Sequence, residues 1–260
     1  MVRTTVRRHP LRGWYVISLR PLNRHGALRR AAAALGARLF AVSTLALEPL
    51  DPGPALAAAL QCADVIVTSP SAVAMARPGL PLPHRRGQRW YALGPGSAAA
   101  LRRRGIRDVQ VPATGNDSEA LLALDDLQRL RGRDVGLLTA PGGRGLIARQ
   151  LRARGARVRV AETYRRVPRA VRAARVAALA ALPARQAILL TSLEAFEPFW
   201  DALDDAARQR LRTAPCVVAS DRLAATAAAL GFRHVLRAEG ARPAQLLRAL
   251  AGHAGDSRIR

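Results

Sequence analysis

Small or polar residues follow the apolar runs of this sequence at four points, and helix-forming residues come next each time. They are Thr68, Ser69, Gly94, Ser97, Thr191, Ser192, Ser220 and Arg222. The apolar runs have the length and composition of buried strands, so these residues are expected where a strand ends and a helix begins. Free backbone N–H groups and the helix dipole favour carboxylates and phosphates there. The set therefore predicts an anion-binding site, although each hydroxyl taken alone also fits plain helix capping.

A tyrosine lies in a different kind of segment, the extended stretch 161–168 near the middle of the chain. An earlier stretch, 42–49, has the same extended character and also ends in proline. We interpret the two stretches as crossings between two similar lobes, and we expect the working site in the cleft that they span. Tyr164 is then a candidate for that site, and a half-buried tyrosine that packs the crossing is the alternative.

Other catalytic patterns are weaker. Residues 94–99 fit the loose Gly-x-Gly-x-x-Gly/Ala pattern of dinucleotide sites, which makes a Rossmann-type nucleotide-dependent enzyme one alternative. Proline inside that turn and the short helix after it argue against this reading. The five histidines are scattered without a carboxylate or cysteine at ligand spacing, so no metal site is expected. No Gly-x-Ser-x-Gly nucleophile elbow is present in the sequence.

The formal net charge is +24, and the sequence has no lysine, so every strong base is an arginine. Such a charge favours an anionic partner, while a composition biased toward arginine explains many of the same residues. A non-catalytic protein that binds polyanions or nucleic acid is therefore a second alternative. The arginines are spread along the chain, and we see neither interleaved aromatic and basic residues nor a clear helix-turn-helix, so nucleic acid is not the expected partner.

The two cysteines, Cys62 and Cys216, form no metal-binding pattern and indicate free thiols in a reducing compartment. No apolar run approaches the roughly 18 residues of a membrane helix. The run 14–19 is too short for the core of a signal peptide. We therefore expect a cytoplasmic protein with no membrane partner.

Strands and helices are expected to alternate along the chain, which predicts parallel sheets with helices on both faces. One of the expected helices begins near Glu119 and runs through Leu130. Three pairs of segments also resemble each other in the same order, at offsets between 119 and 126 residues. The pairs are 66–73 with 189–196, 94–101 with 220–227, and 35–38 with 154–157. The repeat predicts two copies of one α/β unit, with the chain passing between lobes twice.

The order and spacing of these motifs resemble the uroporphyrinogen-III synthase family over nearly the whole chain. The resemblance is carried by Ser18-Leu-Arg-Pro21, Glu48-Pro49, Val67-Thr-Ser-Pro-Ser-Ala-Val73, Gly94-Pro-Gly-Ser-Ala98, Asp117-Ser-Glu-Ala-Leu-Leu122, Gly142-Gly-Arg144, Arg154-Gly-Ala156, Tyr164-Arg165 and Thr191-Ser192. Departures from the family pattern are Leu19 for threonine, Ser97 for threonine, Thr139-Ala140 for Arg-Gly, and Ser220-Asp-Arg-Leu223 for a Gly-x-Thr turn.

The resemblance implies an α/β fold with two flavodoxin-like parallel-sheet lobes, joined by a two-stranded crossing ladder. One discontinuous lobe would comprise residues 1–43 and 167–260, and an inserted lobe would comprise residues 50–160. The linker strands would be 43–49 and 161–167. The protein would be a monomer.

The resemblance also implies a hydro-lyase of tetrapyrrole and haem biosynthesis that needs no cofactor or metal. It would cyclise hydroxymethylbilane, a linear polycarboxylate, with loss of water and inversion of the last pyrrole ring through an azafulvene and a spiro intermediate. Tyr164 would assist departure of the hydroxyl group as a weak acid or as a hydrogen-bond donor. Arg20, Gly142, Gly143 and Arg144 would join the polar residues above in binding substrate. A transient contact with the enzyme that supplies the bilane is a further expectation.

Overall fold

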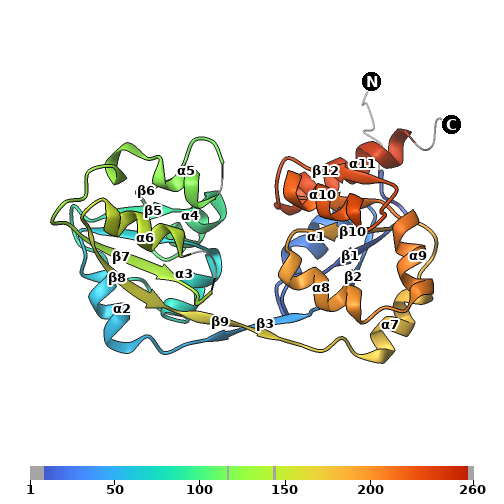
Figure 1. Ribbon diagram of the computed structural model, residues 1–260, viewed down its shortest axis with the longest axis horizontal. Coiled ribbons are helices and arrows are strands. Elements are labelled where there is room, and N and C mark those ends of the chain that lie inside the picture. The colour runs from blue at the N-terminus through green and yellow to red at the C-terminus, as the bar shows by residue number, and fades with distance from the viewer. Residues whose placement is uncertain (1–8, 116, 143–144, 257–260) are drawn as a thin grey trace, which may run out of the picture. The chain divides into compact units, whose positions relative to one another are not determined.

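A computed structural model describes residues 9–115, 117–142 and 145–256. The chain divides between Ala46 and Leu47, and again between Val167 and Pro168, into two compact units. The chain before the first division and after the second forms unit 1, and the chain between the divisions forms unit 2. Each unit is built on one five-stranded parallel sheet, as Figure 1 shows.

The sheet of unit 1 has the strand order β2-β1-β10-β11-β12, which is the 2-1-3-4-5 order of flavodoxin-like folds. Its elements are β1 (Tyr15–Ser18), α1 (Gly26–Ala34), β2 (Arg38–Ala41), α7 (Ala173–Ala180), β10 (Gln186–Leu190), α8 (Leu193–Asp201), α9 (Asp205–Thr213), β11 (Cys216–Val218), α10 (Asp221–Ala229), β12 (Val235–Arg237) and α11 (Pro243–Asp256). Helices α7 to α10 pack on one face of the sheet, where the rings of Phe196 and Trp200 stack with their centroids 5.4 Å apart. Helices α1 and α11 cover the other face.

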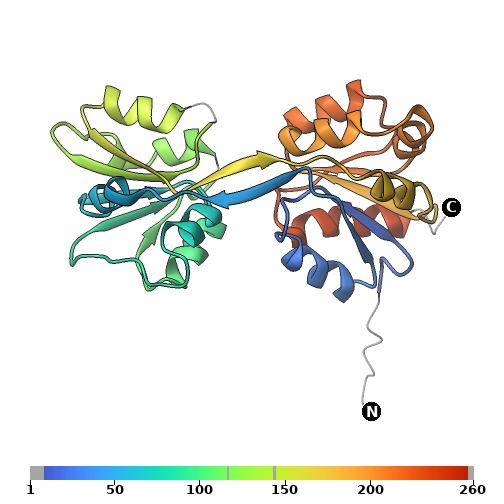
Figure 2. The ribbon, with the colours of Figure 1, turned by 90° about the horizontal axis from the view of Figure 1, so that it is seen from below.

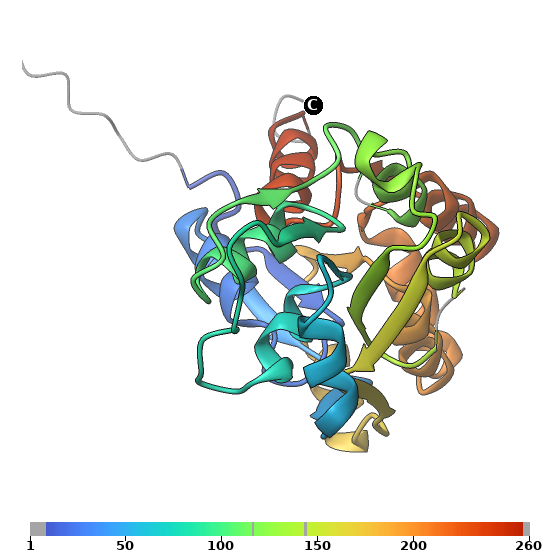
Figure 3. The same cartoon turned by 90° about the vertical axis from the view of Figure 1, so that its left-hand side faces the viewer.

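The sheet of unit 2 has the order β6-β5-β4-β7-β8. Its elements are α2 (Gly53–Leu60), β4 (Asp64–Val67), α3 (Pro70–Ala76), β5 (Arg89–Ala92), α4 (Pro95–Arg102), β6 (Val109–Gln110), α5 (Ser118–Leu122), the 3₁₀ turn η1 (Asp125–Leu127), β7 (Asp134–Thr139), α6 (Leu146–Ala153) and β8 (Arg157–Glu162). Helices α2, α3 and α4 pack on one face, and α5, η1 and α6 on the other (Figure 3). Two parallel sheets covered on both faces confirm the predicted α/β class.

Strands β3 (Leu45–Pro49) and β9 (Tyr164–Pro168) pair in a separate two-stranded sheet, visible in Figure 2. Just beyond its ends, Leu50 N donates to Thr163 O at 3.0 Å, and Arg169 N donates to Thr44 O at 2.7 Å. Residues 50 and 169 differ by 119 positions, and so do residues 44 and 163. The donors of the two hydrogen bonds therefore occupy equivalent positions of the sequence repeat, and so do their acceptors.

The sequence repeat corresponds to a repeat of structure. Written as β2-β1-β10-β11-β12 and β8-β7-β4-β5-β6, the two sheets bring the matched sequence segments to the same positions. Buried threonines repeat one contact: Thr44 Oγ1 donates to Ala195 O at 2.7 Å in unit 1, and Thr163 Oγ1 donates to Ala72 O at 3.1 Å in unit 2. The strand pair β1–β2 that opens unit 1 thus matches the pair β7–β8 that closes unit 2.

The helix predicted from Glu119 through Leu130 is wrong in its length, because α5 ends at Leu122. Leu124 is extended, with φ −60° and ψ 133°, and η1 follows it. The guanidinium of Arg154 donates to the carbonyl of Leu122 at 2.7 Å and to that of Leu127 at 2.8 Å. A donor at the C-cap of α6 thus satisfies carbonyl groups on both sides of the break, which offsets the lost helical hydrogen bonds.

A buried carboxylate holds the amino end of the sheet in unit 2. Asp64, at the start of β4, is fully buried and pairs with Arg89 at 2.9 Å and with Arg133. Tyr91 donates to it at 3.3 Å. Burial raises the pKa of the Asp64 carboxyl. Because ligands of open parallel sheets bind at the carboxyl ends of the strands, we interpret this cluster as structural.

Candidate functional site

The hydroxyl groups of Tyr164 and Ser69 lie 3.1 Å apart in unit 2. Ser69 caps α3, and its Oγ accepts a hydrogen bond from Ala72 N at 3.0 Å. The ring of Tyr164 is buried, with 5% of its surface exposed, in the core beneath α3 and α4. Because Ser69 Oγ already accepts a hydrogen bond from Ala72 N, its own O–H can donate a hydrogen bond to the Tyr164 oxygen, and the phenol O–H can then donate to a ligand.

A second pair of hydroxyls lies beside the first. Thr68 Oγ1 donates to Thr139 Oγ1 at 3.0 Å, and these residues stand at the carboxyl ends of the neighbouring strands β4 and β7. The chain proceeds outward from these two strands in opposite directions, to β5 and β6 on one side and to β8 on the other. That reversal of strand order is where open α/β sheets bind their ligands.

These hydroxyls line a pocket of about 460 Å³ in unit 2. Four residues predicted from the sequence contribute to its lining, namely Thr68, Ser69, Gly142 and Tyr164. Polar lining residues that the sequence analysis did not predict are Ser118, Thr139, Glu162 and Arg166. Gly142 has φ +79°, a left-handed conformation in which its lack of a Cβ matters.

Two further predicted residues stand at the start of α4. Gly94 is the N-cap of that helix, and Ser97 is buried, with 4% of its surface exposed. They follow β5, next to β4, but neither lines the pocket. Gly143 and Arg144 lie outside the described residues.

The remaining predicted residues belong to unit 1. Arg20 follows β1, and its side chain donates to Ala241 O at 2.9 Å, while burial lowers its pKa. Thr191 and Ser192 follow β10, with Ser192 at the N-cap of α8. Ser220 and Arg222 follow β11. Ser220 Oγ caps α10 by accepting a hydrogen bond from the backbone N–H of residue 223 at 3.4 Å, and Arg222 is exposed. They stand at the carboxyl ends of three adjacent strands.

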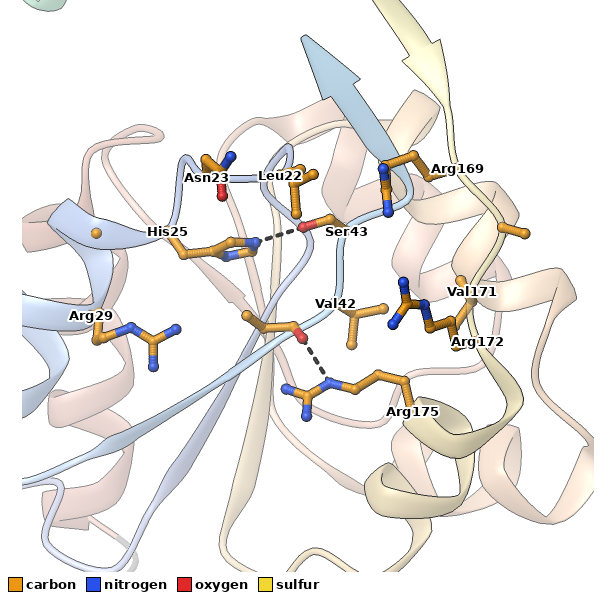
Figure 4. A pocket seen from close by; sticks show the side chains of 13 residues that line it. Leu22, Asn23, His25, Arg29, Val42, Ser43, Arg169, Val171, Arg172 and Arg175 are labelled. Atoms are coloured by element: carbon orange, nitrogen blue, oxygen red, sulfur yellow. Dashed lines mark hydrogen bonds between the residues drawn. The ribbon is translucent and has the colours of Figure 1, made fainter.

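None of the predicted residues lines the pocket of unit 1, which has about 500 Å³ and is shown in Figure 4. Its charged and polar lining consists of Asn23, His25, Arg29, Ser43, Arg169, Arg172 and Arg175. Of the residues that the structure describes, no carboxylate lines this pocket. The pocket is therefore basic, and it opens at the carboxyl ends of β1 and β2.

A neutral histidine forms part of its wall. His25 Nδ1 lies 3.0 Å from Ser18 Oγ, and its Nε2 lies 2.8 Å from Ser43 Oγ, so the ring is held from both sides. Burial, followed by the charges of Arg29, Arg20 and Arg175, lowers the pKa of His25 to about 4. At neutral pH the ring is uncharged, with one nitrogen donating and the other accepting.

One arginine of this pocket is firmly anchored. Arg175 Nε donates to Ala41 O at 2.8 Å, and its guanidinium lies over the ring of Phe40 at 3.6 Å from the centroid. The hydrogen bond uses the Nε edge of the group, and the stacking uses one of its faces. Stacking and one directed hydrogen bond fix the plane of the guanidinium, which leaves its terminal nitrogens to the pocket.

A weak sequence signal for this pocket exists. Arg169, Arg172 and Arg175 are spaced by three residues within the stretch 163–193, which contains no Asp or Glu. In a chain with 42 basic residues such spacing does not stand out. Only the fold brings these arginines next to Arg29 of α1.

In the described part of the chain, no group of three or more His, Cys, Asp or Glu side chains is arranged to hold a metal ion. Within the same residues, every helix is too short or too polar to cross a membrane.

Two α/β units, each with a pocket at the carboxyl ends of its parallel strands, define a protein built from two flavodoxin-like units. Residues 26–248 match the profile of the family described as Uroporphyrinogen-III synthase HemD. The chain belongs to the uroporphyrinogen-III synthase family, which confirms the resemblance inferred from the motifs. It is thus an enzyme that acts on a small-molecule substrate.

Curated relatives carry the same family name. The chain is 33% identical over 193 residues to the uroporphyrinogen-III synthase of Salmonella typhimurium, which covers 72% of this chain and 77% of the relative. It is 31% identical over 191 residues to the enzyme of Escherichia coli, covering 70% and 76%.

Solved structures share the fold. A mutant uroporphyrinogen III synthase from Thermus thermophilus superposes with a TM-score of 0.59 at 20% identity, over 94% of this chain and 99% of that one. The uroporphyrinogen-III synthetase of Helicobacter pylori gives a TM-score of 0.57 at 14% identity, over 92% and 99%.

Proposed function

We propose that the chain is itself a uroporphyrinogen-III synthase, which cyclises hydroxymethylbilane with loss of water and inversion of the last pyrrole ring. The observation that carries this proposal is the Tyr164–Ser69 hydroxyl pair, which lines a pocket at the strand reversal of unit 2 in a chain of that family. The curated relatives bear the name of this activity.

In the proposed reaction, Tyr164 donates its phenolic proton to the hydroxyl group of the bilane, which departs as water, and the proton that the last ring releases on reclosure restores the phenol. The azafulvene cation that remains is attacked by the substituted carbon of the last pyrrole ring, and this step forms a spiro intermediate. Fragmentation and reclosure then invert that ring. Ser69 would orient the phenol by donating a hydrogen bond to its oxygen. A weak acid held in hydrogen-bond reach of a leaving group is the arrangement that general acid catalysis needs.

Binding would use the strand ends. Backbone N–H groups at helix starts and nearby arginines favour the carboxylates of the bilane. The residues that we propose for substrate contact are Arg20, Thr68, Ser69, Gly94, Ser97, Gly142, Gly143, Arg144, Thr191, Ser192, Ser220 and Arg222. Holding the bilane in one bent conformation would lower the activation free energy by on the order of 7–11 kcal/mol in favourable cases. The reacting ends are then already close, so little further conformational entropy is lost.

The proposed enzyme works without a cofactor and as a monomer, and it takes the bilane from the upstream enzyme through a transient contact. Ring closure of the free bilane without inversion is facile, so a short transfer would protect the substrate. We propose that the enzyme works in the reducing cytoplasm, where thiols stay reduced. Cys62 and Cys216 are buried free thiols, which fits that compartment.

The isomer assay tests this proposal. Purified protein is supplied with hydroxymethylbilane, and the oxidised porphyrins are separated by chromatography. We expect isomer III from the protein and isomer I from a heat-denatured sample. A product that is isomer I alone with folded protein would rule the synthase out.

A further inference from the structure

The basic pocket of unit 1 and the hydroxyl-lined pocket of unit 2 occupy equivalent places in the repeat. Asn23 and Gly142 are 119 positions apart, both line their pockets, and both have a left-handed backbone, with φ 63° and 79°. Ser43 and Glu162 are related by the same offset and also line the two pockets. One framework therefore carries two different pocket linings.

The arginines of unit 1 are not required by that framework. Arg29 of α1 lines the pocket of unit 1, and Ala148 of α6, 119 positions later, lines that of unit 2. Arg169 matches Leu50, because the two crossing hydrogen bonds are exchanged by the same offset. The sheet of unit 2 keeps its order and packing without either charge, so the fold does not explain them.

The same comparison holds at the start of α7. Arg175 N donates to Arg172 O at 2.8 Å, as Ala55 N donates to Pro52 O at 2.9 Å at the start of α2. Arg172 and Pro52 are the N-caps of the two helices, so Arg172 corresponds to Pro52 and Arg175 corresponds to Ala55. Three of the four arginines thus stand where unit 2 has an aliphatic residue, and the fourth where it has proline.

The charges of this pocket oppose each other. Burial, followed by the charge of Arg29, lowers the pKa of Arg175. Figure 4 shows the guanidinium groups of Arg29 and Arg175 facing the same hollow. In the described part of the chain, none of the four arginines forms an ion pair with a carboxylate, so the mutual repulsion is not offset within the protein. A bound anion would remove that cost.

We propose that the unit 1 pocket binds a carboxylate-bearing side arm of the substrate, held by Arg29, Arg172 and Arg175. This assignment rests on the proposed function, because the bilane supplies the carboxylates. Planar guanidinium groups bind a carboxylate through paired N–H donors, and Arg175 is already oriented for this by Ala41 and Phe40. His25, buried and uncharged between its two serines, closes the wall and adds no further positive charge beside Arg175.

The first test uses propane-1,2,3-tricarboxylate as a probe. Binding is followed by NMR of the His25 ring, assigned with His25→Gln, and by calorimetry at constant ionic strength. Loss of one guanidinium contact in Arg29→Met is expected to weaken binding about tenfold. Arg175→Met should do the same, with melting recorded because Arg175 also stacks on Phe40.

The matched control is Arg30→Met. Arg30 is the exposed neighbour of Arg29 on α1 and does not line the pocket, so this variant loses the same net charge. Probe binding within about twofold of wild type is expected, since screened surface charges contribute little. Equal weakening by Arg29→Met and Arg30→Met, or no weakening by Arg29→Met, overturns the proposal. Inorganic phosphate that binds more tightly than the tricarboxylate overturns the assignment to carboxylate.

The second test separates this inference from the proposed function. In the synthase assay, Arg29→Met/Arg172→Met is expected to raise KM for hydroxymethylbilane at least about tenfold, with little change in kcat. An unchanged KM overturns the inference while leaving the synthase in place. If wild type forms only isomer I, the proposed function fails, and probe binding that depends on Arg29 still establishes a carboxylate site.

Discussion

Tyr164 is the residue whose role can be tested most directly. Tyr164→Phe keeps the buried ring and removes the hydroxyl that lies 3.1 Å from Ser69. We expect kcat to fall by about 100-fold, because a general acid contributes that order of rate, while KM changes little. Steady-state kinetics on hydroxymethylbilane would measure both. An unchanged kcat would make Tyr164 a packing residue only.

Ser69 is expected to act through Tyr164. Ser69→Ala should lower kcat and also cost roughly 1 kcal/mol of stability, because α3 loses its cap. Asp204→Ala is the matched control: it removes the cap of α9, where Asp204 accepts from Ala207 N at 2.7 Å, far along the chain from the pocket residues. If both variants lower the melting temperature similarly and only Ser69→Ala lowers kcat, the result would support a role of Ser69 in positioning Tyr164. If both variants lose kcat equally, the effect of Ser69 is one of stability.

His25 predicts a pH dependence of folding. Its pKa is about 4 in the folded protein and near 6.5 when unfolded, so between these values the unfolded chain binds more protons. Stability therefore holds above pH 6.5 and falls as the pH drops toward 4, by on the order of 3 kcal/mol from this group. Urea unfolding across this range, compared with His25→Gln, would measure it. The same slope in both proteins would contradict the expectation.

At the scale of elements, α2 approaches β7 so closely that the strand needs a glycine. A Cβ at Gly136 would lie 2.1 Å from Ala59 O, so Gly136→Ala must push helix and strand apart. We expect a loss of about 3 kcal/mol or more in the free energy of unfolding. Gly252→Ala in α11 is the control: nothing lies near its added methyl group, and it should stabilise the protein by up to roughly 1 kcal/mol.

The elements also show how far local sequence carries a prediction. The strand-length runs before Thr68 and Thr191 are β4 and β10, and Gly36 and Gly155 follow the ends of α1 and α6 as expected. These signals are local, so the alternation of strands and helices could be predicted. The break at Leu124 could not, because the donor that satisfies the carbonyl groups around it is Arg154, about 30 positions later in the chain.

At the scale of the whole molecule, the net charge of +24 predicts a salt effect on the proposed reaction. Between about 0.1 M and 1 M salt the screening length falls from roughly 10 Å to 3 Å, so KM for the polyanionic bilane should rise several-fold with little change in kcat. The Arg29→Met/Arg172→Met protein should respond less steeply. A KM that does not depend on salt would show that these charges do not contribute to substrate binding.

The alternative function for the whole molecule is nucleic-acid binding. Family membership now favours the enzyme, and we expect duplex DNA at physiological salt to leave the synthase rate unchanged. Inhibition by DNA at that salt, lost steeply as salt increases, would instead indicate a phosphate-binding surface.

The sequence by itself determined the α/β class, the internal repeat, the family and the hydroxyls at the strand ends. These follow from short-range patterns and their order, which survive in an alanine- and arginine-rich chain. Only the tertiary structure decided which polar groups meet. It set Ser69 against Tyr164, His25 between Ser18 and Ser43, and Arg29 beside Arg175. The physical reason is that these contacts depend on parallel strand pairing between segments that are distant in the chain. An arginine that lines a pocket also cannot be told in the sequence from one that faces solvent.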